Sequence, residues 1–255
     1  MRLGDGIGNL SVSYVEGQPR FLIPGFELIG FMEGDFTARR RIYPETRVDA
    51  SLEKIRANQW KYADYDGDGN PDLIVGHGSN DEYGWADAYN SRGIWTNGPI
   101  HGWVYRLLNR GTDLSPEWAE AENIEADSFP VDVYGMPSPN LADFDGDGDL
   151  DLICGEFLDK LTWFENTGTR TRPVYATGRY LTAEGVIIRM DLEMMVVTAV
   201  DWDGDGDQDL IIGQEDGRVA LVENSGQVRE HMPCFKPPVF FRQEARRAPG
   251  GLEQL

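Results

Sequence analysis

The sequence predicts an all-β protein built from repeated four-stranded units, and two observations carry this prediction. First, the run Asp-x-Asp-Gly-Asp-Gly-x-x-Asp occurs three times, and an apolar run ending in glycine follows each copy. Second, further strand-like runs with turn residues between them recur around each copy. Three copies with the same flanks indicate a repeated structural unit. The acidic runs cover 64–72, 143–151 and 201–209.

Each unit contains four strand-like runs, which we name a to d in chain order. The acidic loop joins strand a to strand b, and strand c ends in an Asn-x-Gly turn that precedes an aromatic segment, strand d. A four-stranded unit repeated in this way is typical of a β-propeller blade. The aromatic residues at the second position of each loop are expected to pack between blades; they are Tyr65, Phe144 and Trp202.

The whole chain, 1–255, is expected to form one β-propeller domain with an incomplete ring of about three and a half blades. The N-terminal segment matches only strands c and d, so it predicts a half blade. A ring of this size would need the remaining blades of a longer chain or a second copy to cover its open edges. The expected parts are a half blade at 1–30, full blades at 56–125, 136–185 and 192–243, and a tail at 244–255.

The spacing of the acidic residues suits a bound cation. Carboxylates at positions 1, 3 and 5 of a tight loop can converge, and glycines at positions 4 and 6 permit the backbone conformations that convergence needs. Position 7 can offer its backbone carbonyl, and the aspartate at position 9 closes the site. Hard oxygen ligands favour Ca²⁺ over Zn²⁺. Mg²⁺, or an acidic turn that is simply solvated, are the alternatives.

The loop differs from an EF-hand, which is the obvious competing interpretation. An EF-hand needs a bidentate Glu at position 12 and a helix on each side. Position 12 is occupied here by Val75, Cys154 and Ile212, and the flanking segments look like strands. The aspartate at position 9 therefore takes the closing role.

The loop, the Leu-Ile-x-Gly strand after it and the Asn-x-Gly turn together resemble the FG-GAP/VCBS repeat family, over residues 60 to about 242 and weakly over 3–28. The resemblance implies a β-propeller whose loops bind Ca²⁺. It leaves the function open, because such propellers occur in adhesion proteins, lectin-like modules and polysaccharide lyases. The implied ligands are Asp64, Asp66, Asp68, Asp72, Asp143, Asp145, Asp147, Asp151, Asp201, Asp203, Asp205 and Asp209, with backbone carbonyls from Asn70, Asp149 and Asp207.

Composition limits the partners and the compartment. A formal net charge of −21 over 255 residues disfavours binding to nucleic acid or to an anionic membrane. The chain has no apolar stretch long enough to insert into a membrane. Because Ca²⁺ sites fill best outside the cytosol, we expect an extracellular or periplasmic location, with an export signal outside this sequence. Cys154 and Cys234 are expected to form neither a disulfide nor a metal site.

The first full unit is interrupted between strands b and c by a long segment, 77–103, which is rich in His, Tyr, Trp and Arg. This b–c loop is expected on the face opposite the acidic loops. Long loops on a rigid scaffold often carry function. His77 follows the glycine of strand b and corresponds to Glu156 and Gln214 in the next units, so we expect these three side chains to ring the mouth of a central channel.

Two functional interpretations of the b–c loop stay open beside the structural one, in which its aromatics only cap the blade. As an enzyme, it resembles part of the propeller-type lyases that cleave uronate polysaccharides. His77 or His101 would then be the base, Tyr83 the acid, and Arg92 the group that neutralises the uronate carboxylate. As a binding module, the same residues would hold a glycan without chemistry. We therefore expect an extracellular calcium-binding propeller that binds or degrades an acidic polysaccharide, and the alternative is a non-catalytic adhesion or protein-interaction module with structural calcium sites.

Overall fold

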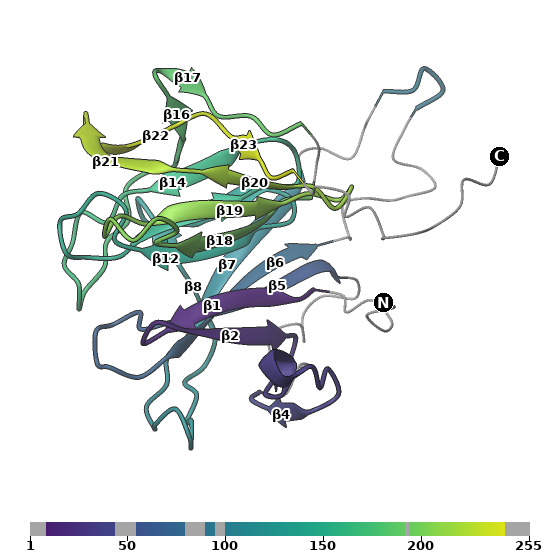
Figure 1. Cartoon of the computed structure of the whole chain (residues 1–255), viewed down its shortest axis with the longest axis vertical. Coiled ribbons are helices and arrows are strands. Elements are labelled where there is room, and N and C mark those ends of the chain that lie inside the picture. The colour runs from purple at the N-terminus through teal and green to yellow at the C-terminus, as the bar shows by residue number, and fades with distance from the viewer. Residues whose placement is uncertain (1–8, 44–54, 80–89, 95–99, 192–193, 243–255) are drawn as a thin grey trace, which may run out of the picture.

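The computed structural model describes residues 9–43, 55–79, 90–94, 100–191 and 194–242 of the chain, and it shows an all-β architecture of several antiparallel sheets (Figure 1). No helix in these residues is long and apolar enough to cross a membrane. Four of these sheets are built from strands that pair in chain order, and these four are numbered here as units 1 to 4.

Units 1 and 2 lie in the N-terminal half of the chain. In unit 2 the acidic loop joins the first two strands, and an additional strand, β11 (Asp132–Tyr134), pairs with the far end of β7. Unit 1 comprises β1 (Ser11–Val15), β2 (Gln18–Ile23), β3 (Phe26–Leu28) and β4 (Arg39–Arg41), and unit 2 comprises β5 (Ile55–Ala63), β6 (Asp72–Ser79), β7 (His101–Leu107) and β8 (Glu122–Asn123).

Units 3 and 4 repeat the plan of unit 2, with an acidic loop between the first two strands, as the sequence predicts. Unit 3 comprises β12 (Ser138–Ala142), β13 (Asp151–Gly155), β14 (Leu161–Phe164) and β15 (Arg179–Tyr180), and unit 4 comprises β18 (Val196–Val200), β19 (Asp209–Gly213), β20 (Val219–Val222) and β23 (Val239–Phe240).

Short elements lie outside the four units. Two of them are hairpins that follow units 2 and 3 in sequence, and a third hairpin is inserted between strands c and d of unit 4, where β22 pairs in parallel with β16. These elements are the 3-10 helix η1 (Phe31–Glu33), β9 (Glu125–Ala126), β10 (Phe129–Pro130), β16 (Thr182–Ala183), β17 (Val186–Ile187), β21 (Asn224–Arg229) and β22 (Met232–Phe235).

Unit 1 differs from the predicted half blade at 1–30. Its strands β1 to β4 form a complete four-stranded antiparallel sheet that extends to Arg41. The sequence signal for strands a and b is missing because a two-residue turn, Glu16–Gly17 with φ of 50° and 74°, replaces the acidic loop. Strands a and b of unit 1 are therefore present without the acidic motif that marks them in units 2 to 4.

Three consecutive arginines form the outer strand of unit 1, β4. Arg40 of β4 forms an ion pair with Glu27 at 2.6 Å, and Glu27 also pairs with Arg20. Glu27 is buried, and the two guanidinium groups lower its pKa although burial opposes them. The run therefore closes the sheet of unit 1.

The first strands of the four units lie together at the centre of the molecule. β1 contacts β5 and β18, and β12 also contacts β5 and β18, so the four strands follow one another in a cycle. Each of these strands has one edge outside its own sheet, and polar side chains of neighbouring units satisfy backbone groups on that edge. Ser13 accepts the N–H of Tyr62 at 2.8 Å, and Ser138 accepts the N–H of Val197 at 2.9 Å.

Lys61 lies at the point where these inner strands converge, with 3% of its surface exposed. Its ammonium group donates to the carbonyl of Val12 in unit 1 at 3.0 Å and to the carbonyl of Val197 in unit 4 at 2.6 Å. A third bond, at 3.1 Å, goes to Oδ1 of Asn140 in unit 3. One side chain of unit 2 therefore joins all three other units.

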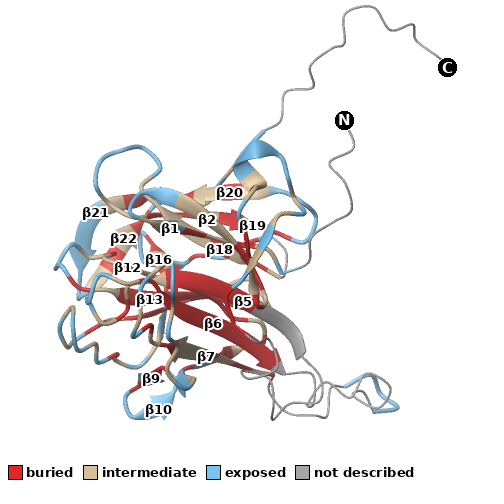
Figure 2. Cartoon of the chain, turned by 90° about the horizontal axis from the view of Figure 1, so that it is seen from below, coloured by how far each residue is buried: buried red, intermediate tan, exposed pale blue. Residues whose placement is uncertain are grey.

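The apolar core consists of three clusters, each between successive units, and Figure 2 shows the buried strands that contribute to them. The prediction that loop aromatics pack between units is confirmed for Tyr65 and Phe144. Both are buried, and their rings contact Tyr175 and Phe235 of the following unit. The prediction is wrong for Trp202, which is 54% exposed because no later unit of the described chain covers it.

Candidate functional site

The backbone of the three acidic loops has the conformation that cation binding requires. All six glycines at loop positions 4 and 6 have positive φ, a region that other residues adopt only with strain. Carboxylate oxygens of each loop can therefore approach one another, as the spacing predicts. The φ values are 73° and 88° for Gly67 and Gly69, 77° and 96° for Gly146 and Gly148, and 78° and 100° for Gly204 and Gly206.

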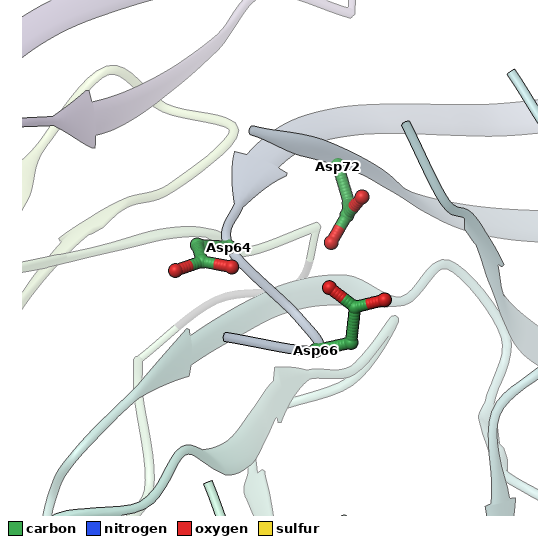
Figure 3. A group of neighbouring side chains, drawn as sticks. All are labelled: Asp64, Asp66 and Asp72. Carbon is green, nitrogen blue, oxygen red and sulfur yellow. The ribbon is translucent and has the colours of Figure 1, made fainter. Parts of the chain in front are cut away.

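Three aspartates of each loop have oxygens within 4.8 Å of one another. Loops 1 and 3 use positions 1, 3 and 9, whereas loop 2 uses positions 1, 3 and 5. In Figure 3 the carboxylates of Asp66 and Asp72 face each other, and Asp64 lies to one side. The three groups are Asp64, Asp66 and Asp72, then Asp143, Asp145 and Asp147, then Asp201, Asp203 and Asp209.

Other predicted ligands lie outside these groups. The position-5 carboxylates of loops 1 and 3, Asp68 and Asp205, accept the backbone N–H of the residue at position 7, at 2.8 and 2.9 Å. Loop 2 has the same bond between Asp147 and Asp149, at 3.0 Å. This bond fixes the backbone at position 7, and the contribution of its carbonyl to a cation stays a prediction.

The donor set of the loops fits a divalent cation. In the described part of the chain, Oδ1 of Asp64 and Oδ1 of Asp66 are buried and accept no hydrogen bond. Burial, with neighbouring carboxylates as a further cause, raises the pKa of Asp72 to about 6 and that of Asp151 to about 8. A hard cation would supply the missing partner and would favour the charged form of both carboxyl groups, in opposition to both pKa shifts.

The aspartate at position 9 closes the loop in a way that the sequence did not reveal. Its carboxylate accepts the backbone N–H of the asparagine that follows strand c, at 2.7 Å in all three units. The asparagine side chain in turn accepts the N–H of the glycine two residues later. The recurring Asn-x-Gly turn is therefore tied to the acidic loop. The pairs are Asp72 with Asn109, Asp151 with Asn166, and Asp209 with Asn224.

Replacing Asn166 by Ala is expected to lower the free energy of unfolding by about 2 kcal/mol. Asn166 is buried, and its Oδ1 accepts the N–H groups of Gly168 and Val174, both at 3.0 Å, which the variant leaves without an acceptor. Urea unfolding of both proteins measures the difference. Asn90→Ala is the matched control, since Asn90 forms a similar turn on the surface. An equal loss in both variants would contradict the assignment.

The structure separates the residues predicted for catalysis in the b–c region. His77 is fully buried, with its ring edge-on to Tyr105 at 6.0 Å, a position that suits packing better than proton transfer. Arg92 lies in an exposed turn, and Tyr83 lies outside the described residues. His77 pairs with Trp103 across the β6–β7 ladder, and His101 lies two residues before Trp103 on β7. The two histidines share this end of the sheet but differ in environment.

His77, Glu156 and Gln214 do not ring a channel mouth. All three are more than 90% buried, and Glu156 accepts a hydrogen bond from the Thr162 hydroxyl at 2.5 Å. The physical reason is their place in the sheet. His77 lies within strand b of unit 2, and Glu156 and Gln214 directly follow strand b of units 3 and 4, whereas the first strand of each unit is the one that contacts the first strands of other units.

His101 keeps a position that suits chemistry or binding. Its Nδ1 lies 2.5 Å from Oδ2 of Asp132, and its ring stacks on Trp103 at 5.7 Å. Both members of the pair are about one third exposed. The sequence did not point to Asp132, because it lies 31 residues after His101 and outside the b–c loop. Only the pairing of β11 with β7 brings it there.

A groove of about 450 Å³ lies beside the His101–Asp132 pair, between units 2 and 3. Phe129, 72% exposed, and Tyr180, 39% exposed, are among its aromatic residues. Asp132 and Glu156 add carboxylates. Aromatic faces beside hydrogen-bonding groups are suited to binding an amphipathic ligand.

Comparison with known proteins identifies the repeat. Residues 64–154 and 143–212 match the model of the FG-GAP-like repeat, and each match begins at the first aspartate of an acidic loop. No curated protein and no solved structure was found to match the chain.

Proposed function

The chain belongs to the FG-GAP-like repeat family, and on this premise we propose that it is a calcium-binding β-propeller module of an exported protein that binds a glycan. The matched residues, 64–212 together, cover more than half of the 255-residue chain. The observation that carries the calcium part is the convergence of three aspartates in each acidic loop.

Ca²⁺ would be held in each loop by the converging carboxylates. The ion would neutralise their mutual repulsion and hold the turn between strands a and b. The position-9 aspartate would transmit this order to the Asn-x-Gly turn through its backbone hydrogen bond. We assign the ions a structural role because the same loop recurs in three units. Such sites fill best in an extracellular or periplasmic compartment.

A propeller arrangement is supported by the cycle of inner strands β1, β5, β12 and β18. The apolar clusters join unit 1 to 2, 2 to 3 and 3 to 4. Unit 4 carries an exposed apolar face with Trp202, Val239 and Phe241. That face suits a further blade of a longer chain or a second copy.

The groove between units 2 and 3 is our candidate glycan site. Phe129 offers an exposed aromatic face for a sugar ring, and the carboxylates of Asp132 and Glu156 can accept hydrogen bonds from hydroxyl groups. Carboxylates in the groove and a net charge of −21 favour neutral sugars over an acidic polysaccharide. A neutral glycan is therefore the first choice.

Phe129→Ala is expected to weaken glycan binding by about tenfold, because stacking on an aromatic ring contributes on the order of 1 kcal/mol. Titration calorimetry with soluble neutral polysaccharides measures the effect. Val186→Ala is the matched control, since Val186 is an equally exposed apolar residue in the hairpin after unit 3. Binding that is absent from the wild type, or unchanged in Phe129→Ala, would rule out this groove.

A polysaccharide lyase that acts on a uronate-containing polymer is the second candidate, and the His101–Asp132 pair is the observation that favours it. A carboxylate on Nδ1 fixes the imidazole so that Nε2 can accept a proton. Tyr83 as the acid and Arg92 as the carboxylate-binding group stay part of this proposal. Absence of ultraviolet-absorbing unsaturated products from every uronate polymer tested would exclude it.

A further inference from the structure

In units 2 and 3, one position of the c–d turn contacts the preceding unit, and its charge differs between the two. The position is the fourth residue after the turn asparagine: Asp113, Arg170 or Val228. Asp113 of unit 2 pairs with Arg20 of unit 1 at 3.0 Å. Arg170 of unit 3 pairs with Asp64 in the acidic loop of unit 2 at 2.8 Å. The residue thus complements the charge that the preceding unit presents.

Arg170 gives acidic loop 1 a contact that loops 2 and 3 lack among the described residues. Its guanidinium binds Oδ2 of Asp64 and donates to the carbonyl of Tyr65 at 3.4 Å. A second arginine, Arg110, pairs with Asp66 at 3.0 Å. Two of the three converging carboxylates of loop 1 therefore already face a cation of the protein itself.

The corresponding aspartates of the other loops make different bonds. Asp143 accepts the N–H groups of its own loop glycines, Gly146 at 2.8 Å and Gly148 at 3.0 Å. Asp201 does the same with Gly204 at 2.8 Å and Gly206 at 3.2 Å. These bonds hold the carboxylate within its loop, whereas Asp64 is directed to the next unit.

We propose that Arg170 is a counter-ion of loop 1 that competes with Ca²⁺. Loop 1 is then the weakest of the three calcium sites, and its occupancy by Ca²⁺ is linked to the contact between units 2 and 3. This inference rests on the proposed calcium binding. Arg170 pairs with Oδ2 of Asp64, while Oδ1 of the same carboxylate is buried and accepts no hydrogen bond. A cation on Oδ1 and the guanidinium on Oδ2 would share one negative charge and repel each other, so Ca²⁺ weakens the ion pair that holds the turn of unit 3.

The contact is close enough for this linkage. A Cβ atom at Gly67 of loop 1 would lie 3.0 Å from the Thr171 side chain and 3.5 Å from the Arg170 carbonyl, so the turn lies directly against the loop. The coupling is reciprocal. The Arg170 contact lowers the affinity of loop 1 for Ca²⁺, and bound Ca²⁺ weakens the Arg170 contact by the same free energy. Arg110 is more exposed and can move into solvent.

Calorimetric titration of the metal-free chain with Ca²⁺ alone tests the proposal. We expect two tighter sites and one weaker site in the wild type. Arg170→Ala is expected to raise the affinity of the weaker site by about fivefold, the effect of losing one competing partly exposed ion pair. Arg172→Ala, with the same change in charge in the same turn, is the matched control and should leave the weaker site unchanged.

Two further variants assign the sites. Asp64→Asn should remove only the weaker site, and Asp143→Asn should remove one of the tighter sites. The opposite result would overturn the inference, and these two variants test it even if Arg170→Ala fails to fold. Three equal sites in the wild type, or an unchanged weaker site in Arg170→Ala, would overturn it while leaving calcium binding intact. No heat of Ca²⁺ binding at all would instead reject the proposed function.

Discussion

Removal of Ca²⁺ with EGTA is expected to lower the melting temperature of the protein by about 15 °C. A ligand at one hundred times its dissociation constant stabilises the folded state by about 2.7 kcal/mol per site, so two tight sites contribute about 5 kcal/mol. For a chain of this size, 1 kcal/mol corresponds to about 3 °C. Calorimetry with and without EGTA measures the shift.

The size of this shift should depend on pH. The pKa of Asp72 is raised to about 6 and that of Asp151 to about 8, mainly by burial. A raised carboxyl pKa favours the folded state at low pH, and this contribution is lost as pH rises through the folded-state value. Without Ca²⁺, the protein should therefore be less stable at pH 8 than at pH 5.

Mg²⁺ is the control cation. Its demand for octahedral geometry and its reluctance to lose water make it a poor substitute in a flexible carboxylate loop. Addition of excess Ca²⁺ after EGTA should restore the melting temperature, whereas Mg²⁺ should restore much less. No change on chelation at either pH would contradict a structural role for Ca²⁺.

Lys61 is expected to contribute a rise of about 3 kcal/mol in the stability of the Ca²⁺-loaded protein between pH 7 and pH 10, and Lys61→Met is expected to remove this contribution. Burial lowers the pKa of Lys61 to about 7, whereas an unfolded lysine titrates near 10.4. Between these values the unfolded chain binds more protons, so the free energy of unfolding increases with pH. This increase in the free energy of unfolding is lost as the pH falls toward 7.

The environment of Lys61 explains why burial dominates. Its three acceptors, the carbonyls of Val12 and Val197 and the Asn140 side chain, are neutral. No carboxylate among the described residues compensates for the loss of hydration of the ammonium group. The bonds orient the ammonium group but do not neutralise it, in contrast to Glu27 between its two arginines.

Urea unfolding at pH 7, 8, 9 and 10 in saturating Ca²⁺ measures the slope, since bound Ca²⁺ keeps the loop carboxylates from titrating. Lys236→Met is the matched control: Lys236 is a half-exposed lysine paired with Glu223, and its removal should leave the slope between pH 7 and 9 intact. An equal slope in the wild type and in Lys61→Met would show that Lys61 is not a buried charge.

The acidic loops were predictable from sequence because the residues that form each of them are close together along the chain. Each loop brings together residues that are at most eight positions apart, and the glycines that allow this are part of the same run. The strands on either side of each loop follow from the same repeat. Unit 1 escaped this prediction because a short turn replaces the loop, so no local motif marks its first two strands.

The groove and the histidine site were only partly predictable. His101 was named from its residue type and from its place at the end of the b–c loop. Its partner Asp132 depends on strand β11, which pairs with β7 after an intervening hairpin. His77 was named on the same grounds, but its position on the second strand places it in packed surroundings.

The sequence by itself determined the repeat, the acidic loops, the strands that flank them and the family, because each depends on residues close together along the chain. Only the tertiary structure decided that Lys61 joins units 1, 3 and 4, that Asp132 lies against His101, and that Arg170 pairs with Asp64 of the first acidic loop. These contacts join residues from 31 to 136 positions apart. No local pattern specifies such partners, since they meet only when the packed sheets bring distant side chains to the same place.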